Sequence, residues 1–319
     1  MRDGYALVLV QPGDPDPDEA ARAHGRSIWQ PGAAFVDPAS RLTGRFLEGR
    51  YEIGERIGEG GMAYVYRGMD QEQRRMVAVK VLSARLVADP EAVARLKREA
   101  ELTMRLDHPN VCHLLALGSD RGLHYLVMPL LMGESLNTRL EIEGTLDPPQ
   151  VVRILRDLAA GLQHAHDNGV LHRDLKPENV MLVPETAGER AIVMDFGLAK
   201  PTEVGDEVRK LTATGVVLGT PEFMSPEQIR GQPLDPRSDQ YALALLAFEL
   251  LTGKLPFQGG SSQETMLHRL SDPPQRLREL RSDAPPPLDE ALARAMSRTP
   301  AERFEDMTTF AAALTDGAD

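Results

Sequence analysis

The chain has 319 residues, of which 48 are acidic and 36 are basic, so its formal net charge at pH 7 is −12. This acidity, with no basic cluster to interrupt it, argues against nucleic acid as a partner. The single cysteine, Cys112, has no disulfide partner within the chain and suits a reducing compartment.

The first 50 residues are expected to form a flexible extension. They begin with a short apolar run at residues 5 to 10, which could form a strand, and continue through GDPDPDE and several glycines and prolines. The apolar run lacks the strongly basic start and the long hydrophobic core of a signal peptide. A docking strand and a cover over a functional site are the alternatives to a simple tail.

Residues 57 to 65, IGEGGMAYV, form a glycine-rich turn between two segments that alternate like strands. The turn contains the glycines Gly58, Gly60 and Gly61. Glycines let backbone amides approach a phosphate closely, and Ala63 stands where the pattern G-x-G-x-x-G has its third glycine. The next expected strand, residues 77 to 80, ends in Lys80, whose ammonium could reach the same phosphates. Taken alone, the turn could be a plain hairpin and the lysine a surface residue.

A helix is expected over residues 90 to 106. Asp89 precedes it as an N-cap, and Pro90 occupies its first turn. Its apolar positions recur every three or four residues and should face inward: Val93, Leu96, Ala100 and Met104. Glu99 lies beside that face and is the carboxylate that we expect to hold the Lys80 ammonium.

Residues 172 to 197 carry the most informative motif, HRDLKPENVMLVPETAGERAIVMDFG. Asp174 is suited to accept or orient the proton of an incoming hydroxyl, and Lys176 to reach a transferring phosphate. The Asn179 amide oxygen and the Asp195 carboxylate are hard oxygen ligands of the kind that Mg²⁺ prefers. An isolated Asp or Asn could be a turn residue. The pattern H-R-D-L-x-x-x-N followed by D-F-G, however, is a known signature of phosphoryl transfer.

With these motifs in this order, residues 51 to about 314 resemble the catalytic domain of a bacterial Hanks-type (eukaryotic-like) serine/threonine protein kinase. The resemblance implies an α+β, bilobal protein-kinase fold. A small β-rich N-lobe with one key helix would span about residues 51 to 128, and a larger, mainly helical C-lobe about residues 133 to 314, with ATP between them. Residues 1 to 50 would precede this domain, and residues 315 to 319 would form a tail.

The resemblance also implies the catalytic roles. Asp174 is the catalytic aspartate, Lys176 contacts the transferring phosphate, and Lys80 holds the α- and β-phosphates. Glu99 pairs with Lys80, because its spacing and its R-E-A context match the family, and Glu101 is the competitor on the same helix. The metal ligands are Asn179 and Asp195, with Mg²⁺ as the ion and Mn²⁺ as an alternative.

By the same resemblance, the apolar run at residues 123 to 133 backs the adenine pocket. Met128 is the gatekeeper, and the backbone of Pro129 and Leu131 bonds the adenine edge. The family often has an acidic residue at the position of Pro129, but this position uses its carbonyl, so the missing N–H need not weaken binding. The whole nucleotide-binding set is Ile57, Gly58, Gly60, Gly61, Val65, Ala78, Lys80, Met128, Pro129, Leu131 and Met181.

Regulation by phosphorylation is a further hypothesis. Arg173 precedes the catalytic aspartate, and in similar kinases it pairs with a phosphate on the activation segment, which here spans residues 195 to 227. Thr212 and Thr214 resemble the autophosphorylation sites of bacterial members, and Lys200 would be a second positive partner. The alternative is that both threonines are ordinary polar loop residues.

Residues 219 to 227, GTPEFMSPE, resemble the family's substrate-facing loop, in which Thr220 helps to position the catalytic residues. Small-molecule phosphotransferases of related fold typically lack this segment, so a protein substrate is favoured. Glu227 should form a structural pair with Arg303, and Asp239, at the start of an apolar helix, should hold the backbone of the catalytic loop.

The motifs therefore imply an enzyme that transfers the γ-phosphoryl group of ATP to serine or threonine hydroxyls of proteins. The alternative is a catalytically weak, nucleotide-binding scaffold of the pseudokinase type. Such scaffolds usually lack at least one of Lys80, Asp174, Asn179 and Asp195, all of which are present here. The sequence does not name the protein substrate, and a dimer of two kinase domains for trans-autophosphorylation is compatible with it.

No membrane span is expected. The only candidate, residues 241 to 251, is about half as long as the ~20 apolar residues that a bilayer needs, and it contains Glu249. We therefore expect a soluble, cytoplasmic protein.

Overall fold

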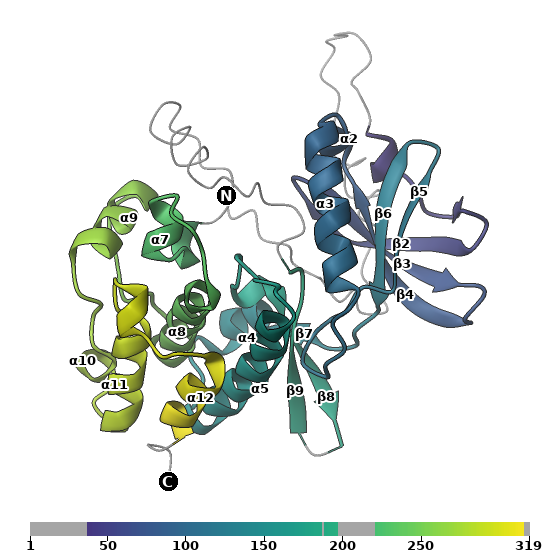
Figure 1. Cartoon of the computed structure of the whole chain (residues 1–319). Helices are drawn as coiled ribbons and strands as arrows, with labels where there is room; N and C mark the ends of the chain where they lie inside the picture. The colour runs from purple at the N-terminus through teal and green to yellow at the C-terminus, as the bar shows by residue number, and fades with distance from the viewer. Residues whose placement is uncertain (1–36, 187, 197–220, 316–319) are drawn as a thin grey trace, which may run out of the picture.

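The computed structural model describes residues 37–186, 188–196 and 221–315. These residues form two lobes, a β-sheet lobe carrying the first helices and a mainly helical lobe (Figure 1). We call residues 37–129 the small lobe and the described residues from 133 to 315 the large lobe. The bilobal α+β fold predicted from the sequence is thus confirmed.

A six-stranded antiparallel sheet forms most of the small lobe, in the order β1-β2-β3-β4-β6-β5. Its strands are β1 (Phe46–Leu47), β2 (Tyr51–Gly60), β3 (Ala63–Asp70), β4 (Arg75–Leu82), β5 (Ala116–Asp120) and β6 (Leu123–Pro129). The strand predicted from apolar alternation lies within β4, where Val77, Val79 and Val81 are fully buried. The glycine-rich turn joins β2 to β3 as a hairpin in which Gly60 is the partner of Ala63.

Two helices follow β4, the short α2 (Ala84–Val87) and the longer α3 (Pro90–Thr103). Asp89 caps α3 as predicted, since its carboxylate accepts hydrogen bonds from the N–H groups of Glu91 and Ala92. The predicted inward positions that are buried are Val93, Leu96 and Ala100. Met104, the C-cap of α3, is 42% exposed, which corrects its predicted inward position. Helix α3 ends at Thr103, three residues before the predicted end.

The segment that precedes β2 belongs to the small lobe, which corrects the expectation of a flexible extension up to residue 50. It contains a short 3-10 helix, η1 (Pro38–Ser40), and strand β1. Three of its apolar side chains are buried in the core of the small lobe: Ala39, Leu42 and Leu47. The Tyr66 hydroxyl donates a hydrogen bond to the Ala39 carbonyl at 2.7 Å. These three side chains pack on the sheet across long stretches of sequence, a contact that no local pattern indicates.

Helices dominate the large lobe. They are α4 (Leu136–Glu143), α5 (Pro148–Asp167), α7 (Pro226–Ile229), α8 (Pro236–Thr252), α9 (Ser262–Ser271), α10 (Leu277–Leu280), α11 (Pro286–Ala295) and α12 (Met307–Thr315), with the 3-10 helices η2 (Pro177–Asn179), η3 (Pro221–Phe223) and η4 (Pro300–Glu302). Helix α8 is buried along nearly its whole length, as its apolar sequence predicts. It begins at Pro236, before Asp239, and the Asp235 carboxylate caps it by accepting from the Arg237 N–H. Within the described ranges, no helix combines the length and apolar character needed to cross a membrane.

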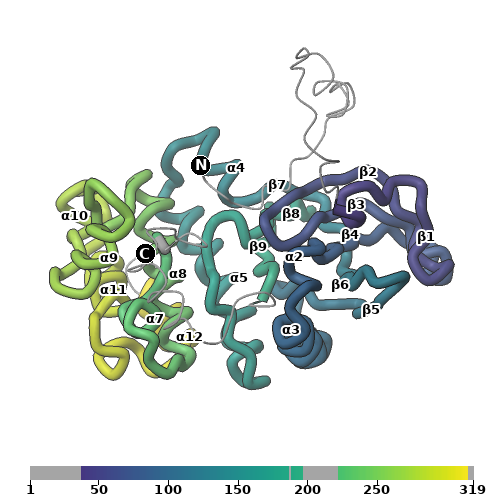
Figure 2. The backbone as a smooth tube through the Cα atoms, turned by 90° about the horizontal axis from the view of Figure 1, so that it is seen from above, coloured from purple at the N-terminus to yellow at the C-terminus, as the bar shows by residue number. Residues whose placement is uncertain are grey.

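A small sheet in the order β7-β8-β9 lies beside the connection between the lobes. Its strands are β7 (Glu134–Ser135), β8 (Val180–Glu185) and β9 (Gly188–Val193). A side chain at Gly133, where the chain enters the large lobe, would clash with the carbonyl of Leu182 on β8, so glycine is required there. Seen from above, α5 and this small sheet lie between the six-stranded sheet and helices α9 to α11 (Figure 2). The loop after β9 meets the six-stranded sheet, since Asp195 lies 2.8 Å from Lys80 of β4.

Candidate active site

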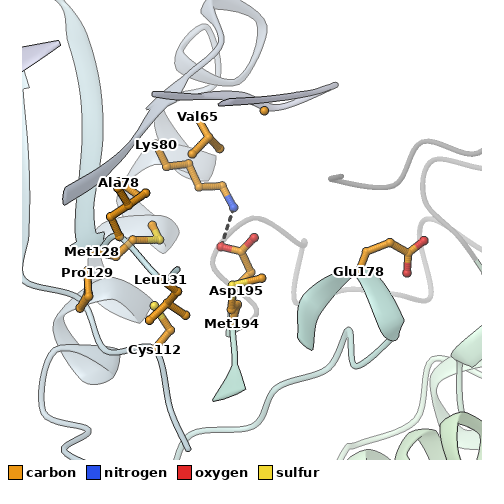
Figure 3. A pocket seen from close by; sticks show the side chains of 12 residues that line it. Val65, Ala78, Lys80, Cys112, Met128, Pro129, Leu131, Glu178, Met194 and Asp195 are labelled. Carbon is orange, nitrogen blue, oxygen red and sulfur yellow. Dashed lines mark ion pairs between the residues drawn. The ribbon is translucent and has the colours of Figure 1, made fainter. Parts of the chain in front are cut away.

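A cavity that is partly open to solvent is bounded by β-strands of the small lobe, by the connection between the lobes and by the loops before β8 and after β9 (Figure 3). Its lining residues are Gly58, Val65, Ala78, Lys80, Cys112, Met128, Pro129, Leu130, Leu131, Glu178, Met194 and Asp195. A largely apolar lining with a few polar groups at one end is typical of small-molecule sites.

The cavity brings together most of the predicted nucleotide-binding set. Those that line it are Gly58, Val65, Ala78, Lys80, Met128, Pro129 and Leu131. Four members of the set are not among its lining residues: Ile57, Gly60, Gly61 and Met181. Ile57 is buried in β2, and Gly60 and Gly61 lie at the β2–β3 turn. Met181 is buried in a cluster with Cys112, Ile192 and Met194, directly next to the cavity wall.

Four lining residues were not predicted: Cys112, Leu130, Glu178 and Met194. Leu130 lies within the predicted apolar run, and Glu178 and Met194 each precede a predicted metal ligand, so the motifs could have indicated these three. Cys112 had no such signal, because it reaches the cavity from a separate loop. Burial raises the pKa of the Cys112 thiol to about 12, so it is neutral at physiological pH.

Asp239 holds the backbone of the catalytic loop, as predicted. The Asp239 carboxylate accepts hydrogen bonds from the backbone N–H groups of His172 and Arg173, both at 2.8 Å, and it also contacts the His166 ring at 2.8 Å. Burial alone would raise the pKa of Asp239, but the hydrogen bond from His166 and the other contacts outweigh it, so the pKa lies below its ordinary value. A charged carboxylate therefore fixes the loop backbone just before Asp174.

His172 connects this loop to the loop that carries Asp195. Its Nε2 donates to the Met194 carbonyl at 2.8 Å, and its Nδ1 accepts from the Asp174 N–H at 3.2 Å. The ring also meets the buried Phe196 edge-on, with centroids 4.9 Å apart. The two loops that carry the predicted catalytic and metal residues are thus joined by one side chain.

Within the catalytic loop, the three predicted side chains converge. The Asn179 Nδ2 donates to the Asp174 carbonyl at 2.8 Å, which holds the loop closed around η2. The Lys176 ammonium lies 3.8 Å from the Asp174 carboxylate and is nearly buried. The structure therefore places a carboxylate and an ammonium side by side in the catalytic loop.

The residues present fit the implied Mg²⁺ ion. The Asn179 Oδ1 is buried and has no hydrogen-bond partner among the described residues, so an oxygen of the hard type that Mg²⁺ prefers remains to be satisfied. Asp195, on the adjacent loop, supplies a carboxylate that lines the cavity. Two protein oxygens suit Mg²⁺, which keeps several waters or phosphate oxygens in its coordination sphere.

The predicted pair of Lys80 with Glu99 is not among the ion pairs of the described residues, and it stays a prediction. The Lys80 ammonium instead lies 2.8 Å from Asp195 (Figure 3), and the Glu99 carboxylate lies 3.1 Å from the Arg173 guanidinium. Arg173 and Asp195 both have a positive φ, 65° and 55°, which is uncommon for residues other than glycine. Spacing along the chain cannot tell which of two carboxylates reaches the lysine. Burial raises the pKa of Glu99, and Arg173 opposes that shift.

The predicted structural pair beneath the substrate-facing segment is confirmed. The Arg303 guanidinium donates to both oxygens of Glu227, at 2.7 and 2.8 Å, and both residues are buried. The Ser238 hydroxyl donates to the same carboxylate at 2.7 Å. The predicted residues Lys200, Thr212, Thr214 and Thr220 lie outside the described residues.

Comparison with known proteins gives a consistent result. The family model "Protein kinase domain" matches residues 51–312. The chain is 39% identical over 275 residues to serine/threonine-protein kinase pkn3 of Myxococcus xanthus, covering 85% of this chain and 50% of that protein. It is 37% identical to PknL of Mycobacterium tuberculosis, covering 86% of this chain and 67% of that protein. The chain thus spans about half to two thirds of the length of these relatives.

Solved structures agree with the sequence comparisons. The crystal structure of the PknI kinase domain of Mycobacterium tuberculosis, as a C20A mutant, superposes with a TM-score of 0.68 and 27% sequence identity. The match covers 91% of this chain and all of that one. The two-lobed arrangement and the loops around the cavity therefore belong to a known architecture.

Proposed function

Because the chain belongs to the protein kinase domain family, we propose that it is a serine/threonine protein kinase that transfers the γ-phosphoryl group of ATP to protein hydroxyls. The observation that carries this proposal is the catalytic loop, in which Asn179 holds the Asp174 backbone and Lys176 lies beside the Asp174 carboxylate. The relatives, which are named as serine/threonine-protein kinases, support the choice of acceptor. None of these contacts favours a nucleotide-binding scaffold over an enzyme.

Asp174 orients the acceptor hydroxyl and takes up its proton in this proposal. Its backbone is held by His172 and Asn179, so the carboxylate is positioned before the acceptor arrives. Lys176, which is nearly buried beside it, stabilises negative charge on the transferring phosphoryl group. Asn179 and Asp195 would hold Mg²⁺, which when bound neutralises charge on the phosphate oxygens.

The apolar part of the cavity holds the base of the nucleotide. Val65, Ala78 and Met128 present apolar side chains to it, and the backbone of Pro129 and Leu131, which also line the cavity, would bond the adenine edge. The residues of the β2–β3 hairpin cover the phosphates, and Lys80 binds them through its ammonium. Lys80 is only 5% exposed and ends inside the cavity, which suits an anionic ligand.

The two ion pairs of the site have to change partners for this chemistry. Lys80 is bound to Asp195, the proposed metal ligand, and Glu99 is bound to Arg173. We infer that the competent state pairs Lys80 with Glu99, frees Asp195 for the metal and frees Arg173. A phosphate on Thr212 or Thr214 would compete with Glu99 for Arg173, because a phosphate carries more negative charge than a carboxylate. Autophosphorylation would in this way promote the exchange.

The experiment that tests the function is autophosphorylation with Mg-ATP, comparing the wild type with Asp174→Asn and mapping phosphates by mass spectrometry. We expect phosphate on Thr212 or Thr214 in the wild type and none in the variant. Nucleotide binding without phosphate transfer by either protein would contradict the proposed activity. Phosphate elsewhere, with both threonines unmodified, would support the activity but refute the proposed switch.

A further inference from the structure

Arg269, on helix α9, is a fully buried arginine whose two terminal nitrogens bind backbone oxygens of one short segment. Its Nη1 donates to the Met224 carbonyl at 2.8 Å, and its Nη2 donates to the Glu222 carbonyl at 2.6 Å. The guanidinium also lies over the Phe257 ring, 5.6 Å from its centroid. No motif in the sequence indicates this residue, and the proposed chemistry does not use it.

The two contacts of Arg269 satisfy backbone carbonyls at and just after the end of a short helix. The 3-10 helix η3 ends at Phe223, and carbonyls at the end of a helix lack partners within it. Arg269 donates to the Glu222 carbonyl, within η3, and to the Met224 carbonyl, which directly follows it, and its positive charge suits the negative end of the helix. Burial lowers the pKa of Arg269, and the nearby Tyr241 and Glu222 oppose that shift. A rigid guanidinium fork that binds two carbonyls fixes the direction of the backbone between them.

The other side of the same segment is attached to the catalytic loop. Ser225 and Gln228 form a capping box at the start of α7, and the Gln228 side chain donates to the Arg173 carbonyl at 2.8 Å. Arg173 directly precedes Asp174. Residues 222 to 228 therefore bridge α9 and the catalytic loop, with Arg269 at one end and Gln228 at the other.

A small apolar cluster strengthens the attachment to α9. It consists of the buried residues Met224, Ile229 and Met266, with Leu270 packed against them. Arg303, the other fully buried arginine nearby, differs in kind, since its terminal nitrogens bind the Glu227 carboxylate as well as backbone. Both terminal nitrogens of Arg269 bind backbone on a segment that faces the catalytic loop.

We propose that Arg269 is a positioning residue for the protein acceptor: it sets the backbone of residues 222 to 224 so that an acceptor chain lying on this segment presents its hydroxyl to Asp174. The proposal rests on the proposed kinase function and adds a residue of α9 to the acceptor site. It predicts that replacing the Arg269 guanidinium raises KM for the protein acceptor and leaves nucleotide binding unchanged.

The test uses the full chain with dephosphorylated casein as acceptor and compares wild type, Arg269→Lys and Arg269→Gln. We expect KM for casein to rise about tenfold in Arg269→Gln, the factor that corresponds to one lost hydrogen bond to a charged group, with KM for ATP within about twofold. Arg269→Lys keeps the charge but not the fork, so its KM for casein should be intermediate. ATP hydrolysis without acceptor should be the same in all three proteins.

The matched control is Arg278→Gln, which replaces an exposed arginine on α10. This variant should leave KM for casein and KM for ATP unchanged. An unchanged KM for casein in a folded Arg269 variant would overturn the proposal, as would equal losses in casein use and in ATP hydrolysis. Failure of both variants to fold would overturn it too, since Arg269 would then be a folding residue. A wild type that transfers phosphate to neither casein nor itself would instead refute the proposed function.

Discussion

Two ion pairs in this molecule differ in their burial and in the number of contacts between the charged groups. Glu227 and Arg303 have side chains that are 3% and 0% exposed, and both carboxylate oxygens are bound by the guanidinium. Glu99 and Arg173 have side chains that are 24% and 29% exposed and share a single contact of 3.1 Å. The first pair lies beneath the segment from residue 222 to 228, and the second joins α3 to the catalytic loop.

The difference teaches which pair can change partners. Separating Glu227 from Arg303 would leave a buried charge without compensation, which is strongly unfavourable. Glu99 and Arg173 keep about a quarter of their side-chain surface in water, so separating them costs less, and well-exposed pairs contribute only about 0–1 kcal/mol. The buried pair therefore maintains the fold, and the partly exposed pair can change partners during the proposed activation.

Breaking the buried pair should have the largest effect on stability. Glu227→Gln leaves Arg303 buried without its carboxylate, so the free energy of unfolding should fall by about 3–5 kcal/mol. Urea unfolding at pH 7 measures this loss. Glu185→Gln, which removes the exposed partner of Arg190, is the control and should cost less than about 1 kcal/mol. Similar losses in the two variants would show that burial does not distinguish these pairs.

Acid should weaken the buried pair in a defined pH range. Burial alone would raise the pKa of Glu227, but Arg303 and Ser238 outweigh it, so its folded-state pKa lies below the ordinary value of 4.5. Its contribution to stability is therefore complete above pH 4.5 and is lost as the pH falls through the folded-state pKa. The difference in unfolding free energy between wild type and Glu227→Gln should shrink as urea unfolding is repeated from pH 6 down to pH 3. A constant difference over this range would contradict the assignment.

Removing the exchangeable carboxylate should affect catalysis more than folding. Glu99→Gln should change the free energy of unfolding by less than about 1 kcal/mol. It should nevertheless lower kcat/KM for ATP by roughly tenfold or more, because Lys80 then loses its partner in the competent state. Glu101→Gln, an exposed residue on the same helix, is the control and should alter neither quantity. A stable Glu99→Gln protein with full activity would refute the exchange of partners.

Local patterns predicted much of the site. The catalytic loop and the loop that carries Asp195 were placed correctly, because their residues lie close together in the chain and follow a fixed motif. The cap of α3 by Asp89 and the burial of α8 followed from equally local signals. The Glu227–Arg303 pair joins distant residues, and only the resemblance to a known family indicated it.

By itself, the sequence determined the chemistry of the site, the order of its motifs and the helical and strand periodicities, since these depend on residues near one another in the chain. Only the tertiary structure decided that Lys80 meets Asp195, that Glu99 meets Arg173, that residues 37 to 50 pack on the small lobe and that Arg269 holds the segment at Glu222. Each of these contacts joins side chains or backbone from separate elements. Their partners are chosen by backbone direction, burial and competition between nearby charges, none of which is written in local spacing.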